Sequence, residues 1–178
     1  MVPCNTTDNN GLSGVLVSEL GFLDKLTLLN LEQGTIGGSI PTEYGLLQRL
    51  VTFDMDSNLF TGTIPYFPIP SLEKLDLSGN VFTGSIPEDL FDLSKLQNLQ
   101  LNNNLLSGII PSELGDLSQL QNLQLENNSL GGTVPTEMGN LNILGKLKDG
   151  SQHIQSVILV HHTHSSHPFS FSLSVIDS

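Results

Sequence analysis

The sequence predicts an α/β repeat fold: a solenoid with one parallel concave β-sheet and short helical or 3-10 turns on its convex side. Three observations predict it. Anchor residues recur at spacings of 24, 22, 24 and 24 residues: Gly34, Asn58, Asn80, Asn104 and Asn128. An apolar pattern of the type Leu-x-x-Leu-x-Leu precedes every anchor, and Gly-x-Ile-Pro or a close variant follows it. The chain has 17 glycines, 9 prolines and no alanine in 178 residues, which argues against a bundle of long helices.

The segment before each anchor is predicted to be a short strand with one buried face. In the fourth full repeat, for example, Leu96, Leu99 and Leu101 supply the apolar positions, and the last part alternates apolar and polar residues. One such strand cannot bury its apolar face alone. Copies stacked about 4.8 Å apart can share a continuous leucine core, because their backbones pair as a parallel sheet.

The segment after each anchor is predicted to bend the chain away from the sheet. The anchor asparagine can hydrogen-bond the backbone of the bend, a glycine four residues later admits a tight turn, and a proline at plus seven fixes it. Residues 111–115 and 135–139 then predict single helical turns that begin with proline and end with glycine. Residues 65–70 contain three prolines and predict an extended polyproline II segment in place of that turn.

The extent of the repeat pattern divides the chain into three regions. Residues 1–22 predict a partial N-terminal repeat, and residues 23–149 predict the solenoid, with about five full repeats and a sixth that is broken where Asp149 replaces a leucine. Residues 150–178 are outside the repeat, rich in serine, and predict a disordered tail. This tail holds a short histidine-rich tract at residues 161–167, a weak candidate for metal binding. An alternative is that residues 154–160 cap the open end of the core.

Residues 96–115 match the pattern L-x-x-L-x-L-x-x-N-x-L-x-G-x-I-P-x-x-L-G. The chain therefore resembles the plant-type leucine-rich repeat family. In that family the solenoid presents a concave binding face, usually in cell-surface receptors, receptor-like proteins or secreted inhibitors of polysaccharide hydrolases. The resemblance implies a non-enzymatic binding module at the cell surface or outside the cell, although this chain contains no signal peptide or transmembrane segment. Family members usually begin with a cap that has paired cysteines, whereas Cys4 is the single cysteine of this chain.

Charge limits the class of partner. The chain has 6 Lys+Arg against 18 Asp+Glu, a formal net charge of −12. The charge argues against nucleic acid and anionic membranes as partners, because binding to either requires clustered cations. A protein or peptide ligand, in particular a basic one, is expected, with an oligosaccharide as a further candidate.

The predicted ligand-binding residues are the strand residues that point away from the core into the concave face. They are acidic in the first three repeats and rich in amides in the last two, which favours a basic peptide at one end and hydrogen-bonding polar groups, sugars included, at the other. The alternative is an ordinary solvated sheet face. The predicted residues are Asn30, Glu32, Asp54, Asp56, Asp76, Ser78, Gln100, Asn102, Gln124 and Glu126.

The carboxylates of the acidic end suggest two other chemistries. Asp54 and Asp56 lie about 6.6 Å apart on one strand face, a separation found in inverting glycosidases. Exposed carboxylates, however, lack the raised pKa of a general acid, so no catalytic residue is predicted. A weak calcium site with Asp76 is conceivable from its oxygen ligands, but no metal site and no cofactor is assigned.

Three rival functions remain open at this stage: an inhibitor of a secreted polysaccharide hydrolase, a structural scaffold repeat, and, as the weakest, a hydrolase. Asn5 and Asn127 stand in Asn-x-Ser/Thr patterns and are candidate glycosylation sites if the chain is secreted.

Overall fold

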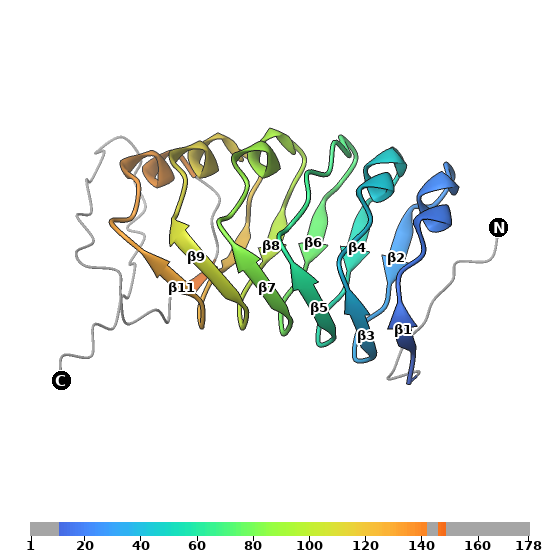
Figure 1. Cartoon of the computed structure of the whole chain (residues 1–178). Helices are drawn as coiled ribbons and strands as arrows, with labels where there is room; N and C mark the ends of the chain where they lie inside the picture. The colour runs from blue at the N-terminus through green and yellow to red at the C-terminus, as the bar shows by residue number, and fades with distance from the viewer. Residues whose placement is uncertain (1–10, 142–145, 149–178) are drawn as a thin grey trace.

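The computed structural model describes residues 11–141 and 146–148. Figure 1 shows the repeats stacked along one axis, with short helices along one edge of the stack. Cys4, Asn5, the segment 154–160 and the histidine-rich tract at 161–167 lie outside the described residues. The capping, glycosylation and metal hypotheses for these residues therefore stay predictions.

The first sheet is the predicted concave sheet. It contains six parallel strands, β2 (Leu28–Asn30), β4 (Thr52–Asp54), β6 (Lys74–Asp76), β8 (Asn98–Gln100), β10 (Asn122–Gln124) and β12 (Lys146–Lys148). Neighbouring strands pair at equivalent repeat positions, so Phe53 lies beside Leu75 and Leu75 beside Leu99. The predicted solenoid of stacked leucines is confirmed by this register.

A second parallel sheet lies on the other side of the core, and the sequence analysis did not predict it. Its six strands are β1 (Ser13–Val15), β3 (Thr35–Gly38), β5 (Leu59–Gly62), β7 (Val81–Gly84), β9 (Leu105–Ile109) and β11 (Ser129–Gly131). The glycine at plus four does bend the chain, since Gly62 and Gly84 have φ values of 84° and 81°. The residues before that glycine, however, are extended and pair with the next repeat.

The third layer consists of 3-10 helices, each of five residues. They are η1 (Ser18–Phe22), η2 (Thr42–Leu46), η3 (Glu88–Asp92), η4 (Ser112–Asp116) and η5 (Thr136–Asn140). A proline precedes four of them, and Val17 precedes η1. Residues 63–69 form no helix, as their prolines predict. Phe67 and Ile69 are nevertheless completely buried and fill the core where a helical turn would have packed.

The anchor asparagines hydrogen-bond the backbone of their own bends, as predicted, and they also reach the preceding repeat. The Asn80 Oδ1 atom accepts a hydrogen bond of 3.0 Å from the Phe60 amide of the preceding repeat. The Asn80 Nδ2 group lies within hydrogen-bond distance of the Met55, Leu77 and Ser78 carbonyl oxygens. Asn58, Asn104 and Asn128 repeat this arrangement. Each asparagine therefore ties its own bend to the repeat before it.

Within residues 11–141 and 146–148, no helix is long and apolar enough to span a lipid bilayer.

Candidate ligand-binding face of the concave sheet

The strand register aligns one predicted site residue from every repeat. Asn30 pairs with Asp54, Asp54 with Asp76, Asp76 with Gln100, and Gln100 with Gln124. Because parallel strands are spaced about 4.8 Å apart, these five side chains form one column across the sheet. The structure thus brings together the central column of the predicted face.

The first three members of this column also shape the backbone after each strand. The side-chain oxygen of Asn30 accepts a hydrogen bond of 3.1 Å from the Glu32 amide. Asp54 and Asp76 accept equivalent bonds of 3.2 Å from the amides of Asp56 and Ser78. These Asx-type turns fix the backbone of Glu32, Asp56 and Ser78, which are also predicted site residues.

The acidic end differs from the prediction, which placed exposed carboxylates there. Asp54 and Asp76 are only 3% and 6% exposed. Lys74 Nζ lies 2.5 Å from Asp54 Oδ2 and 3.6 Å from Asp76 Oδ2. Gln100 donates a further hydrogen bond to Asp76 Oδ2. The aligned carboxylates are therefore paired and covered, because Lys74 on β6 lies beside Asp54 of the preceding strand and Asp76 of its own strand and offsets part of their charge.

The pKa values in this cluster follow from burial and charge. Desolvation raises the pKa of Asp76, and the negative charge of Asp54 adds to it, while the hydrogen bond from Ser78 and the charge of Lys74 act in the opposite direction. Burial alone would lower the pKa of Lys74. The hydrogen bond to Asp54 and the charges of Asp54, Asp76 and Glu32 outweigh it, so the pKa of Lys74 is raised.

The carboxylates that remain accessible at this end are those at the strand exits. Asp56 and Glu32 are both half-buried. Asp56 Oδ1 accepts hydrogen bonds from the Ser78 hydroxyl at 2.9 Å and from the Ser57 hydroxyl at 3.1 Å. Ser78, another predicted site residue, is itself buried and holds Asp56 and Asp76 together. A ligand would meet Glu32, Asp56 and the Lys74 side chain, which is 34% exposed.

The amide end is half-buried and presents acceptors. Gln100, Asn102, Gln124 and Glu126 are all partly exposed. Three side-chain oxygens in this part of the described chain are shielded from solvent and have no hydrogen-bond partner: Asn102 Oδ1, Asn122 Oδ1 and Glu126 Oε2. Asn102 and Glu126 occupy equivalent positions in neighbouring repeats. The shielded oxygens lie out of reach, so a ligand could contact only the exposed parts of these four side chains.

The structure also places the other candidates. Asp54 binds Lys74 and the Asp56 amide, so Asp54 and Asp56 do not form an open carboxylate pair. No cluster of three or more histidine, cysteine, aspartate or glutamate residues suited to a metal ion occurs within the described residues. Asn127, the second glycosylation candidate, is exposed at a strand exit, and its Nδ2 group donates to Asn103 Oδ1 at 2.7 Å.

A second column of side chains on the same face, which contains Thr52, Lys74 and Asn98, was not predicted to bind a ligand. Lys74 belongs to it, two residues before Asp76 on the same strand, and pairs in register with Thr52 and Asn98. The signal was available, because side chains two apart on a strand point to the same side. The burial and pairing of Asp54 could be foreseen only from the position of Lys74 beside it on the next strand.

The comparisons with known proteins agree with this geometry. A family model described as leucine rich repeat matches residues 69–130. The plant peptide hormone receptor RGFR1, solved in complex with RGF2, is 40% identical with a TM-score of 0.73, and the match covers 74% of this chain and 22% of that one. The Arabidopsis receptor kinase HAESA, solved with the peptide hormone IDA and the co-receptor SERK1, is 36% identical with a TM-score of 0.73, covering 75% and 23%.

A shorter relative matches over most of its own length. In the BIR3–SERK2 complex from Arabidopsis thaliana, the matching chain is 34% identical with a TM-score of 0.64, and the match covers 72% of this chain and 69% of that one. No curated protein sequence matches the chain. The chain spans about a fifth of the length of the longer receptors it matches. With its repeat register, two parallel sheets and asparagine connections, the chain belongs to the leucine-rich repeat family, and its repeats are of the type found in plant receptor ectodomains.

Proposed function

We propose that the chain is a non-enzymatic binding module that holds a protein or peptide ligand on its concave sheet. The observation that carries this proposal is the register of the face, which aligns polar side chains of five repeats in one column. A ligand in an extended conformation could contact several repeats at once. The similar structures of RGFR1 and HAESA, both solved with peptide hormones, support the same class of ligand.

The ligand is basic where it meets the first three repeats. Glu32 and Asp56 are the accessible carboxylates there, and Lys74 neutralises only part of the charge of Asp54 and Asp76. A cationic side chain placed at the strand exits gains two carboxylate partners. The amide end suits the hydrogen-bond donors of a peptide backbone or of an oligosaccharide. The matches to extracellular receptor ectodomains favour a location at the cell surface or outside the cell, and they do not favour a hydrolase inhibitor.

The proposal is tested with two synthetic probes, a heptapeptide of lysine and serine and a matched heptapeptide of glutamate and serine. Calorimetric titration of the full chain is expected to detect the basic peptide alone. Glu32→Gln together with Asp56→Asn should weaken its binding about three- to ten-fold, because partly exposed ion pairs contribute about 0.2–1 kcal/mol each. Raising the salt concentration should weaken it further.

The matched control removes the same charge elsewhere. Glu113→Gln with Glu137→Gln changes two exposed carboxylates on η4 and η5 and should leave the affinity within about two-fold. Equal losses in the two double variants would mean that net charge alone attracts the peptide, and the proposed site would be wrong.

A further inference from the structure

The bend between β10 and β11 places two adjacent asparagines in different environments. Asn128 is the anchor: its Oδ1 atom accepts a hydrogen bond of 3.0 Å from the Leu106 amide, and its Nδ2 group donates to the Leu101 carbonyl oxygen at 2.9 Å. Asn127 is exposed, and its φ of 57° lies in the left-handed region. Figure 1 shows these bends along the edge of the stack opposite the 3-10 helices. The Asn127 side chain therefore lies at an open edge of the solenoid.

Asn127 also begins an Asn-x-Ser pattern. Ser129, two residues later, is exposed, and its hydroxyl has no hydrogen-bond partner among the described residues. In secreted proteins this pattern on a surface loop is the acceptor of N-linked glycosylation. No other asparagine of residues 11–141 begins the pattern. The packing of the repeat explains why residue 128 is asparagine, and it leaves the pattern at Asn127 without a structural role.

Asn103 provides a natural comparison, because it holds the same position one repeat earlier. It is exposed, has the same φ of 57°, and precedes the anchor Asn104. Leu105 stands where the serine would be required, so Asn103 does not begin the pattern. The two bends thus differ in the hydroxyl and share their backbone geometry.

The hydrogen bond of Asn127 is compatible with an attached sugar. Its Nδ2 atom carries two hydrogens, and the group donates to Asn103 Oδ1 at 2.7 Å. A glycosidic bond replaces only one of these hydrogens. The other can keep the bond to the preceding repeat while the sugar extends into solvent.

We propose that Asn127 is a site of N-linked glycosylation. The Nδ2 atom forms a bond to the anomeric carbon of an oligosaccharide, and the amide gives up one proton. The bond between that carbon and a lipid-linked diphosphate breaks, and the diphosphate leaves. The donor is therefore an oligosaccharide carried on a lipid diphosphate. This inference rests on the location outside the cell that the proposed function includes.

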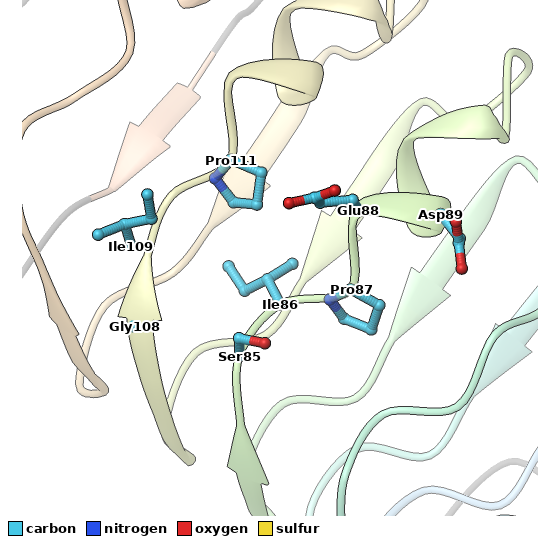
Figure 2. A pocket seen from close by; sticks show the side chains of 8 residues that line it. All are labelled: Ser85, Ile86, Pro87, Glu88, Asp89, Gly108, Ile109 and Pro111. Carbon is cyan, nitrogen blue, oxygen red and sulfur yellow. The ribbon is translucent and has the colours of Figure 1, made fainter.

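The glycan borders the amide end of the concave sheet, since Asn127 directly follows Glu126. It lies away from the groove of about 480 Å³ between the third and fourth full repeats. Figure 2 shows that groove between Ile86 and the end of β9 at Ile109, whereas the bend at Asn127 precedes the start of β11. The sugar is thus attached at the edge of the stack where the concave sheet ends.

The test is secretion of the full chain from eukaryotic cells behind an added cleavable leader, with glycopeptide mass spectrometry to locate the sugars. Most of the secreted chain should carry a glycan at Asn127, and Asn103 should carry none. Because the leader supplies the route out of the cell, a bare Asn127 would refute this site alone. The peptide titration of the concave sheet would be unaffected, so the two proposals can fail separately.

Ser129→Ala should lower the occupancy of Asn127 at least about ten-fold, because it removes the hydroxyl of the pattern and leaves the asparagine in place. The matched control is Ser107→Ala, at the residue that pairs with Ser129 on β9, and it should leave the occupancy within about two-fold. A secreted chain without sugar at Asn127, a sugar at Asn103, unchanged occupancy in Ser129→Ala, or an equal loss in Ser107→Ala would each overturn the proposal.

Discussion

At the scale of single residues, the buried anchor asparagines stabilise the solenoid by hydrogen-bonding the backbone of two successive repeats. Asn80 is 8% exposed and serves the Phe60 amide and three carbonyl oxygens from two repeats. Met55, Leu77 and Ser78 follow β4 and β6 and lie outside any helix or strand, so side chains supply donors to their carbonyl oxygens. The asparagine column is thus a structural element.

Asn80→Ala is expected to lower the free energy of unfolding by about 3 kcal/mol, because it leaves the buried Phe60 amide without its acceptor and removes one of the donors to the Met55, Leu77 and Ser78 carbonyl oxygens. Urea denaturation measures the change. Gln119→Ala removes an exposed polar side chain and should change stability by less than about 0.5 kcal/mol. Similar losses in the two variants would show that the asparagine contacts are not what stabilises the bend.

The burial of Asp76 makes the free energy of unfolding depend on pH. Its unfolded carboxyl titrates near 3.8, and burial raises the pKa in the folded chain. Between these two pKa values the folded state binds more protons than the unfolded state, so the contribution of Asp76 to the free energy of unfolding falls as pH rises through this window. Below 3.8 the contribution no longer changes, because the carboxyl is protonated in both states.

Asp76→Asn should remove this dependence. The free energy of unfolding of the original chain minus that of the variant is expected to decrease as the pH rises above about 3.8, measured by urea denaturation at each pH. Asp116→Asn, at an exposed carboxyl on η4, provides the comparison. If the difference in the free energy of unfolding between the original chain and Asp76→Asn grew with pH, the charge of Lys74 would outweigh burial in setting the pKa of Asp76.

At the scale of elements, the proline-rich segment at residues 65–70 replaces a helix without opening the core. The Phe67 ring packs edge-on against the Phe53 ring, with the centroids 5.3 Å apart. Phe53 in turn contacts Tyr44 of η2, with centroids 6.1 Å apart. An aromatic group therefore fills the volume that the leucine of a 3-10 helix occupies in other repeats.

Phe67→Ala is expected to lower the free energy of unfolding by about 3–5 kcal/mol, since it leaves a cavity in this aromatic group. Tyr66→Ala is the matched control. The Tyr66 ring, next to Phe67 in the chain, is 46% exposed, so its loss should lower the free energy of unfolding by less than about 1 kcal/mol. Denaturant unfolding of both variants measures the contrast. Equal effects would mean that the segment is held by its prolines and not by Phe67.

The elements also show what the sequence could and could not predict. Leucine periodicity predicted the strands of the concave sheet and their register, because a shared core admits one alignment. It missed the second sheet, since a strand of three to five residues before a glycine resembles a turn. It also missed the burial of Asp54 and Asp76. Lys74 contacts Asp54 across two strands, and Gln100 of the next strand contacts Asp76, so these contacts depend on pairing between repeats.

At the scale of the whole molecule, the two sheets differ in register and in charge. Equivalent residues pair in the concave sheet, whereas in the second sheet Thr61 pairs with Val81 and Thr83 with Leu105, a shift of two repeat positions at each step. The six strands of the second sheet contain no charged residue. Among the described residues, the charges therefore lie on the concave sheet, the bends and the 3-10 helices.

The central claim, that the aligned polar face of the concave sheet is the ligand surface, is tested most directly by NMR mapping. The ¹⁵N-labelled chain is titrated with the lysine–serine heptapeptide at low salt. The account predicts saturable shifts at the amides of Asn30, Glu32 and Asp56, with smaller shifts toward Gln124. Shifts confined to the 3-10 helices or the second sheet, with the concave strands unchanged, would contradict it.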